Sequence, residues 1–538
     1  MRRDVETIKG RIDIAEIVGG YVKLEKAGLN FKAQCPFHNE KTPSFFVSPS
    51  RQNFYCFGCG AKGDVITFVE DMEGLSFKDA LKFLGDKVGI ELEGYDAGSN
   101  ISRSEKEDLR RITEEALKFF EKNLEDRKDV VEYLVSRGLD KESIKSWKIG
   151  YALPEWRTLY EHLVNLGYDK SLILKAGLAK PVEGDAEKSP YDVFRDRIIF
   201  PLFDPSGKVV AFSGRAFGKD TEPKYLNSPD TPLFTKSELL YGLDRAKDEI
   251  RRRNYAVLVE GQMDLVLSHY AGIPNTVASS GTAFTRLHLE RLKRLSPRII
   301  LAFDGDSAGI KAAEKSTILA YLLDMEVKIA RMPEGSDPAD LVKKDKNLWR
   351  DVIRDSLPAI EYFLDQIILE EKDARKQAKL IGKKILPMVA LLKSRMEQAY
   401  FVSLLARKTL TKEEAIWEDV KRVDVTKLDN PVASTEDSEP SFSREEVKLN
   451  RKDLVESRLK EIESWKNELG EDTSLLDKIN KEEEELLKHL RVEEAKEELE
   501  ELYQALSTSE KEANLKEEVR ISERIQEVFK KLRGLEEN

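Results

Sequence analysis

Long hydrophobic runs are missing from this sequence. Apolar runs such as 255–259 and 299–303 fall far short of the roughly 18–20 apolar residues needed to cross a bilayer. The first residues, MRRDVETIKGRIDIAEIVGGY, scatter acids among apolar positions and lack the apolar core of about 7–15 residues that marks a secretory signal. We therefore expect no membrane span and a cytoplasmic location.

Cysteine is also scarce, with three residues in 538. An odd number clustered near one end argues against a disulfide framework. Hydrophobic residues make up 40% of the chain and charged residues 35%, against usual shares of about 45–50% and about 25%. This composition predicts folded domains joined to a very polar region. At roughly 150 residues per domain, the length predicts about three or four domains.

The net charge of −11 is spread unevenly. Residues 431–538 carry about −12, which leaves about +1 for everything before them. The acidity is therefore confined to the tail, and the remainder of the chain carries no negative excess that would exclude a nucleic-acid partner.

Composition and periodicity divide the chain into four regions. Residues 1–100 hold a short amphipathic helix, all three cysteines and a closing helical pattern. Residues 105–423 carry strand and helix patterns. Residues 424–445 are rich in Ser, Thr, Asp and Pro, which is typical of a linker. Residues 446–538 place apolar side chains at helical spacings in a highly charged tail.

The large central region has three parts. Residues of about 105–245 combine a helical start with two strands on either side of the turn 205–207. Residues of about 250–345 alternate strand and helix, which predicts a parallel sheet covered by helices. Residues of about 346–423 are expected to be helical throughout. The predicted class is a multidomain α/β protein with a central α+β segment and a helical C-terminal region.

Two pairs of metal ligands stand near the N-terminus, Cys35-Pro-Phe-His38 and Cys56-Phe-Gly-Cys59. A gap of two residues lets a tight turn aim both ligands at one ion, and two such turns supply a soft tetrahedral set that suits zinc. Four protein ligands leave no open position, so we expect a structural Zn²⁺. The alternative is ordinary buried thiols beside a surface histidine.

Cations and aromatic residues alternate around these ligands. Such a mixture suits single-stranded nucleic acid, because bases stack on aromatic rings while cations meet phosphates. The same aromatic residues also suit the core of a small ribbon. The cations are Lys32, Lys41, Arg51 and Lys62, and the aromatic residues are Phe45, Phe46, Phe54, Tyr55 and Phe57.

Carboxylates stand where the central strands end. The run YAVLVE ends at Glu260, RIILAFD ends at Asp304 with Asp306 two residues on, and Asp337 and Asp340 follow the strand VKIARM. Parallel strands bring these acids to one edge of the sheet, where ligands bind in open α/β folds. Converging carboxylates favour Mg²⁺ or Mn²⁺, although acids are also common in ordinary strand-to-helix turns.

A segment rich in basic and polar residues precedes this sheet. Its side chains can contact phosphates by charge and by hydrogen bonding. Neighbouring acids cancel much of the basicity, so a charge-balanced surface is the competing interpretation. The candidates are Arg195, Arg197, Arg215, Lys224, Tyr225, Asn227, Ser228 and Lys236.

Glu260 followed by Asp304-Gly-Asp306 resembles the Toprim fold of bacterial primases, topoisomerases and related nucleases. With the Cys-His-Cys-Cys ribbon and the string PKYLNSP ahead of it, the order looks like a bacterial DnaG-type primase over roughly residues 1–423. The resemblance implies a zinc-binding template-recognition domain in 1–100 and an RNA polymerase domain in 105–423. It also implies synthesis of short RNA primers on single-stranded DNA by two-metal nucleotidyl transfer.

The resemblance assigns roles to residues that match the family pattern. Cys35, His38, Cys56 and Cys59 become the zinc ligands. Glu260, Asp304, Asp306 and Asp337 become the catalytic Mg²⁺ or Mn²⁺ cluster. The template and nucleotide groove is lined by Arg195, Arg197, Arg215, Lys224, Tyr225, Asn227 and Lys236.

Two departures from the family pattern leave questions open. The family's Asp-Pro-Asp is replaced by Asp337-Pro-Ala339-Asp340, so either Asp340 takes over as the last metal ligand or that ligand is missing. The tail is shorter than the family's helicase-binding domain and rich in Glu. We still expect 446–538 to bind a replicative helicase, with a self-packed helical hairpin as the alternative.

The further expectations concern partners. By resemblance, the chain uses a single-stranded DNA template and ribonucleoside triphosphates, works as a monomer and associates with the nucleoid during replication. Two other functions stay open on the residues alone. One is a Toprim-type nuclease or topoisomerase, and the other is a non-catalytic zinc adaptor whose acidic tail binds another protein.

Overall fold

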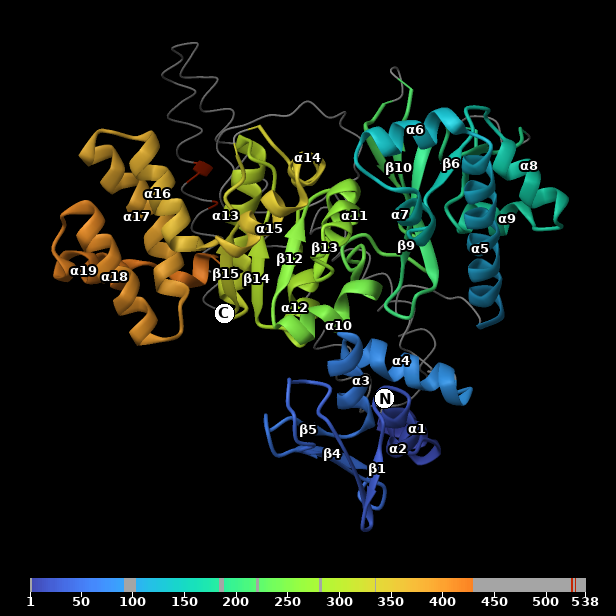
Figure 1. Ribbon diagram of the computed structural model, residues 1–538, viewed down its shortest axis with the longest axis horizontal. Helices are drawn as coiled ribbons and strands as arrows, with labels where there is room; N and C mark the ends of the chain where they lie inside the picture. The colour runs from blue at the N-terminus through green and yellow to red at the C-terminus, as the bar shows by residue number, and fades with distance from the viewer. Residues whose placement is uncertain are drawn as a thin grey trace. The chain divides into compact units, whose positions relative to one another are not determined.

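The computed structural model describes residues 2–90, 103–182, 188–218, 222–279, 283–333 and 335–428, together with Arg524, Ile525 and Val528 (Figure 1). The chain divides into two compact units, 1–434 and 435–538, and the helices and strands with defined bounds all belong to the first unit. Most of the predicted linker 424–445 and nearly all of the predicted tail 446–538 lie outside the described residues. Within the described ranges, every helix is too short or too polar to span a bilayer.

The N-terminal domain is a five-stranded antiparallel ribbon, in the order β1-β2-β3-β4-β5, with four helices. Because side chains alternate between the two faces of a strand, Phe45 and Phe54 pack in a core that also contains Phe68 of α3. Asp64 starts α3 by accepting the N–H groups of Ile66 and Thr67, as an N-cap does. The elements are α1 (Arg2–Arg11), α2 (Ile14–Gly19), β1 (Glu25–Ala27), β2 (Asn30–Ala33), β3 (Phe45–Ser48), β4 (Asn53–Cys56), β5 (Lys62–Gly63), α3 (Val65–Glu73) and α4 (Phe77–Val88).

The next part is built on an antiparallel sheet in the order β11-β10-β9-β6. The two long strands β9 and β10 are almost wholly buried, and the predicted turn between them forms because Asp204 Oδ1 accepts the N–H groups of Ser206 and Lys208. The elements are α5 (Arg103–Glu125), α6 (Lys128–Ser136), α7 (Lys141–Ser146), β6 (Gly150–Ala152), α8 (Thr158–Asn165), α9 (Lys170–Lys175), β7 (Ala179–Lys180), β8 (Tyr191–Asp192), β9 (Arg197–Phe203), β10 (Val209–Ala216) and β11 (Tyr225–Asn227).

The second sheet runs in the order β13-β12-β14-β15-β16, with the first four strands parallel. The predicted parallel sheet is confirmed. It is mixed, because the two-residue β16 pairs antiparallel with β15, and so short a strand gives no periodic signal. The elements are α10 (Leu243–Arg253), β12 (Ala256–Val259), α11 (Gln262–Tyr270), β13 (Thr276–Ala278), α12 (Arg286–Leu295), β14 (Arg298–Leu301), α13 (Ser307–Leu322), β15 (Glu326–Ile329), α14 (Pro338–Lys344), α15 (Lys346–Arg354) and β16 (Leu357–Pro358).

A helical part follows and packs beside the β15–β16 end of this sheet (Figure 1). One continuous apolar cluster runs from the sheet, through Leu258 and Ile299, to Ile385 and Val402 of the helices. The helices therefore extend the core of the sheet and support one of its faces. They are α16 (Ala359–Glu370), α17 (Ala374–Leu391), α18 (Arg395–Thr409) and α19 (Glu413–Arg422), followed by the 3₁₀ turn η1 (Val425–Leu428).

Candidate active site and zinc site

The four predicted zinc ligands come together in the ribbon. Their ligand atoms all lie within 4.8 Å of one another. Cys35 Sγ lies 3.8 Å from Cys59 Sγ, and Cys56 Sγ lies 3.8 Å from His38 Nδ1. Zinc–sulfur bonds of about 2.3 Å place two tetrahedral sulfurs about 3.8 Å apart. The four donors and their spacing therefore fit Zn²⁺, in a site whose four coordination positions are all filled by protein.

Local backbone structure aims these ligands. Cys56 ends β4, and the turn back into β5 is closed by hydrogen bonds from Gly60 N–H to the Cys56 carbonyl (2.9 Å) and from Cys56 N–H to the Ala61 carbonyl (2.8 Å). Gly60 has φ +78°, a conformation that glycine adopts without steric cost. The turn thus directs Cys56 and Cys59 to the same point.

The thiols differ in how easily they ionise. Burial raises the pKa of the Cys35 thiol. Burial also opposes ionisation of Cys56, but its hydrogen bond with the Ser44 side chain and those from backbone N–H groups outweigh it, and the pKa of Cys56 is lowered. A cation at the centre would favour the thiolate form of every cysteine, because zinc binds the deprotonated ligand.

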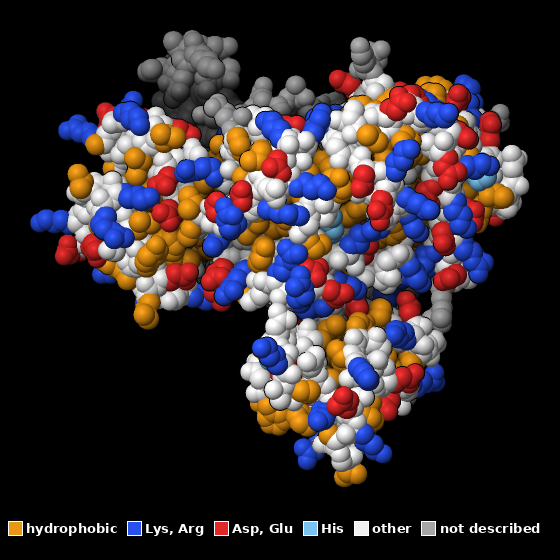
Figure 2. Space-filling view, viewed as in Figure 1, with side chains coloured by type: hydrophobic (Ala, Val, Ile, Leu, Met, Phe, Trp, Pro, Cys, Tyr) orange, Lys and Arg blue, Asp and Glu red, His pale blue; other side chains and the backbone are white. Residues whose placement is uncertain are grey.

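The aromatic residues of the ribbon divide between its two faces. Phe45 and Phe54 are buried, so for them the core interpretation holds. Tyr55 is 42% exposed and Phe57 73% exposed, and hydrophobic side chains gather near β4 and β5 on the surface of this domain (Figure 2). Strand pairing sets Lys32, Phe46, Tyr55 and Lys62 in one row across β2 to β5, so two aromatic rings lie between two cations.

The strand-end acids meet at the carboxyl edge of the parallel sheet. Glu260 directly follows β12, and its Oε1 accepts the N–H of Asp304, which follows β14, at 3.4 Å. Asp306 is the N-cap of α13 and accepts the Gly309 N–H at 2.8 Å. Asp337 is the N-cap of α14 and accepts the N–H of Asp340 at 2.7 Å.

These carboxylates perturb one another. Burial, then the charges of Asp304 and Asp306, raise the pKa of Glu260 to about 7. Burial, then Asp337 and Asp306, raise the pKa of Asp304 to about 6. Among the described residues, the Cys-His group alone brings three or more ligand atoms within 4.8 Å, so the acids form a looser set. A loose oxygen set suits Mg²⁺ or Mn²⁺, since Mg²⁺ keeps several of its waters.

The sequence reasoning missed Asp264. This residue of α11 is buried, and its Oδ1 accepts the N–H of Ala339 at 3.2 Å. Burial, then the charges of Asp337 and Asp304, raise its pKa to about 7. The available signal was its place four residues after Glu260, in the first turn of the helix that follows the strand.

Asp340 also raises the pKa of Asp304, which places it in the electrostatic environment of the cluster.

Part of the basic segment lies beside these acids. Lys224 is exposed and lowers the pKa of Asp304. Tyr225 follows it on β11 and is held by Arg215 of β10, whose guanidinium donates to the Tyr225 hydroxyl at 2.9 Å. The charge of Asp264 contributes to the raised pKa of Tyr225, which is about 12 and is due first to burial. The β10–β11 hairpin therefore presents basic and hydroxyl groups next to the acidic edge.

The other predicted groove residues have different surroundings. Arg195 stacks 4.3 Å from the ring centroid of the exposed Trp156 and 5.3 Å from that of Tyr191. Arg197 is buried and donates to the carbonyls of residues 214, 222 and 223, so it braces the β9–β11 backbone. Lys236 lies in the loop before α10, where its N–H donates to Asp230.

Asn227 and Ser228 occupy the far end of the same hairpin. Asn227 closes β11 and is half-buried, while Ser228 is buried and its hydroxyl accepts the Phe212 N–H at 3.0 Å.

A closed Cys-His metal site, an acidic edge on a parallel sheet and a basic hairpin beside that edge together define a class: metal-dependent enzymes that act on nucleic-acid phosphates.

Comparison with protein families agrees with this class and narrows it. Residues 1–99 match a CHC2 zinc finger, residues 119–247 match the N-terminal domain of the DNA primase catalytic core, and residues 257–342 match a Toprim-like domain. The first of these supports Zn²⁺ at the Cys-His site.

Similar proteins are DNA primases. The DNA primase of Halalkalibacterium halodurans is 36% identical over 425 residues, covering 78% of this chain and 70% of the relative. The DNA primase of Pseudomonas aeruginosa is 39% identical over 386 residues, which cover 70% of this chain and 58% of that relative. Among solved structures, the zinc-binding and RNA polymerase domains of the Aquifex aeolicus primase match with a TM-score of 0.51 and 32% identity, covering 77% of this chain and 99% of that chain. A primase domain from Pseudomonas aeruginosa matches with a TM-score of 0.51 and 34% identity, covering 58% and 100%.

The chain belongs to the bacterial DnaG-type DNA primase family. It is a nucleotidyltransferase that synthesises RNA primers, as the resemblance predicted. These relatives favour primase over the nuclease and adaptor alternatives.

Proposed function

We propose that the acidic edge of the second sheet carries the nucleotidyl transfer. Glu260, Asp304 and Asp306 would hold two divalent cations, Mg²⁺ or Mn²⁺, with Asp337 and Asp340 completing the cluster. The observation that carries this proposal is the convergence of the acids at one edge of the sheet, where burial and then their mutual repulsion raise the pKa of Glu260 to about 7 and that of Asp304 to about 6. Partly buried carboxylates that repel one another gain most from a shared cation.

The carboxylates, the helices that carry them and Lys224 each have a role in the proposed reaction. Bound cations would lower the pKa of the attacking 3′-hydroxyl and neutralise the charge of the triphosphate. The carboxylates fix where those charges sit, and helices α13 and α14 hold Asp306 and Asp337 rigidly as N-caps. Lys224 stands where it can meet a nucleotide phosphate beside Asp304.

The template would be single-stranded DNA, held at two places. Solved primase domains of this family have been described with single-stranded DNA and with double-stranded DNA carrying an overhang. On this chain, the Arg195–Trp156–Tyr191 stack offers an exposed ring beside a cation, and the Lys32–Phe46–Tyr55–Lys62 row offers a second stacking surface on the ribbon. Such pairs hold bases with little sequence preference.

The domain roles follow the same proposal. Residues 1–100 would recognise template, 105–423 would polymerise ribonucleoside triphosphates, and 446–538 would bind a replicative helicase, with 424–445 as the linker. The chain would act as a monomer in the cytoplasm, on the nucleoid during replication. Arg197 is left out of the template groove because its burial commits it to backbone carbonyls.

Glu260→Gln tests the proposal. We expect primer synthesis to fall by at least about 100-fold, because a ligand of the proposed catalytic cations is lost, while affinity for single-stranded DNA stays within about twofold. The matched control is Glu326→Gln, which removes the same charge from the opposite end of the same sheet, where Glu326 pairs with Arg298 at the surface. Near-normal synthesis by Glu260→Gln would refute the assignment.

A further inference from the structure

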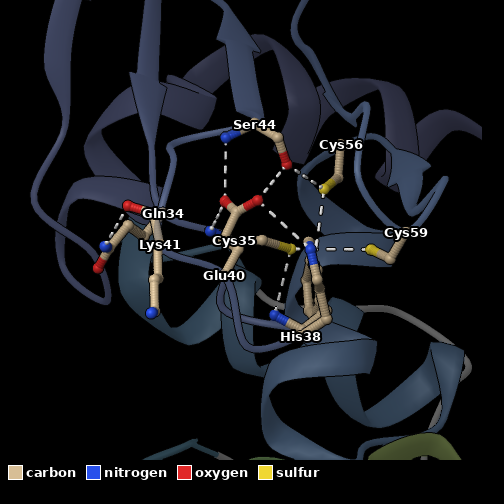
Figure 3. Close-up of polar contacts among 9 residues, drawn as sticks. Gln34, Cys35, His38, Glu40, Lys41, Ser44, Cys56 and Cys59 are labelled. Atoms are coloured by element: carbon tan, nitrogen blue, oxygen red, sulfur yellow. Dashed lines mark hydrogen bonds and ion pairs between the residues drawn. The ribbon is translucent and has the colours of Figure 1, made fainter.

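Glu40 contacts the zinc site without being one of its four ligands. Its Oε2 lies 3.3 Å from His38 Nε2, whereas the other ring nitrogen, Nδ1, faces Cys56 Sγ at 3.8 Å (Figure 3). The imidazole is therefore held between a carboxylate on one side and the sulfur cluster on the other. We propose that Glu40 is a positioning residue, which keeps the proton of His38 on Nε2 and so presents Nδ1 to the ion.

Glu40 is itself fixed by the turn that carries it. Its Oε1 accepts the N–H of Cys35 at 2.7 Å and that of Ser44 at 2.9 Å, and its Oε2 accepts the Ser44 hydroxyl. The side chain is only 10% exposed. A carboxylate with this many donors has one defined orientation, so it can impose one on the imidazole.

The same carboxylate reaches a third ligand through Ser44. The Ser44 hydroxyl also lies 3.2 Å from Cys56 Sγ, so Glu40 is joined to the backbone of Cys35, the ring of His38 and, in one step, the sulfur of Cys56. Figure 3 shows these contacts converging on Glu40 from one side of the ligand cluster.

Space around the ring is limited as well. A Cβ at Gly58 would lie 2.6 Å from His38 Nε2 and 2.8 Å from Ser44 Oγ, so only glycine permits this approach. Glycine at position 58 therefore leaves the room that the ring occupies beside Glu40. A carboxylate behind a metal-binding histidine fixes the tautomer and raises the basicity of the ligand nitrogen.

A simpler role would explain some of the same contacts. Glu40 could act only as a cap of its turn, through the two backbone N–H groups that it accepts. The two roles predict different results for the metal. A turn cap changes the stability of the fold and leaves the ligand field alone, whereas a positioning residue changes how the histidine nitrogen binds.

The experiment uses the full chain with Glu40→Ala, Glu40→Gln and the control Glu25→Gln, which removes an exposed charge from β1 of the same domain. Zinc affinity is measured by competition with a chelator, and the visible spectrum of the Co²⁺-loaded protein reports the ligand field. We expect Glu40→Ala to lower zinc affinity by about 10–100-fold and to shift the Co²⁺ bands. Glu40→Gln, which keeps an acceptor, loses less, and Glu25→Gln stays within about twofold.

Two outcomes would overturn the proposal. One is zinc affinity within about twofold of the intact chain for both Glu40 variants. The other is a loss of affinity with an unchanged Co²⁺ spectrum, which would assign Glu40 to the turn alone. If Glu40→Ala does not fold, Glu40→Gln decides, since it keeps the size of the side chain and an oxygen for the backbone donors.

Discussion

At the scale of single residues, the proposed active site is a set of carboxylates kept close against their mutual repulsion. Glu260, Asp264 and Asp304 all have raised pKa values, due first to burial and then to neighbouring acids. Lys224 lowers the pKa of Asp304 and offsets only part of this repulsion. A site of this kind binds metal and protons in competition.

The raised pKa values predict proton release when metal binds. Metal needs the ionised carboxylates, so affinity for Mn²⁺ should rise as the pH increases through about 6–7 and level off above about 8. Without metal, the raised pKa values stabilise the folded state most below the ordinary carboxyl pKa of about 4, and that contribution is lost as the pH rises from there to about 7. Calorimetric titration with Mn²⁺ in two buffers of different ionisation enthalpy counts the protons.

Asp304→Asn provides the comparison for this titration. We expect fewer protons released and weaker Mn²⁺ binding than in the intact chain. Binding that is independent of pH between 6 and 8, with no proton release, would contradict the account of the cluster.

The positions of some residues could be predicted from the sequence and those of others could not. The zinc ligands and strand-end acids stand in local patterns, a two-residue gap and a strand end, that fix their direction. Arg195 and Arg197 look alike in sequence, yet one stacks on Trp156 at the surface and the other is buried against carbonyls. Their surroundings come from distant parts of the chain, which no local pattern encodes.

At the scale of elements, a buried polar bridge joins the two sheets. Gln262, the first residue of α11, donates to the hydroxyl of Ser213 on β10 at 2.7 Å, and both side chains are buried. Strand β10 also carries Arg215, and α11 follows Glu260 directly. The bridge therefore sets the spacing between the basic hairpin and the acidic edge.

Removing either partner should disturb this spacing. We expect Gln262→Ala and Ser213→Ala each to lower kcat for primer synthesis, because the β10–β11 hairpin and the acids, which we propose bind nucleotide and cations, lose their register. The double variant should show a coupling of about 0.5–1.5 kcal/mol in unfolding free energy, the usual net value of a hydrogen bond. Chemical denaturation and steady-state synthesis measure the two effects, and strictly additive values in both would contradict a bridging role.

The alternating strand and helix segments were predictable, because each run of buried apolar residues ends in a turn and is followed by a helix-period pattern. The predicted strand at YAVLVE corresponds to β12, and RIILAFD to β14. The β16 strand was not predictable, since Leu357–Pro358 is a strand only through its pairing with β15.

At the scale of the whole molecule, charge separates two parts of the chain. Residues 431–538 carry a net charge of about −12 and the residues before them about +1, which together give the net charge of −11. An acidic segment is poorly suited to hold a DNA backbone, which is itself negative. This division favours a protein partner for the tail and leaves template binding to the rest of the chain.

Deleting residues 435–538 tests this division. We expect primer synthesis on free single-stranded DNA to stay within about threefold of the intact chain, since the Cys-His site and the proposed acidic cluster both lie in residues 1–434. Co-sedimentation with the cognate replicative helicase should be lost. Asp304→Ala in the full chain is the reciprocal control, which should bind helicase and make no primer. Helicase binding by the deleted chain would contradict the proposed role of the tail.

The central claim is that the acidic edge of the second sheet performs template-directed nucleotidyl transfer. The most direct measurement is incorporation of labelled ribonucleotides on single-stranded DNA with Mg²⁺ or Mn²⁺, comparing the intact chain with Asp304→Ala. The account predicts short RNA products from the intact chain alone. Equal synthesis by both proteins would contradict the assignment of this site, and strand cleavage without incorporation would contradict the reaction itself.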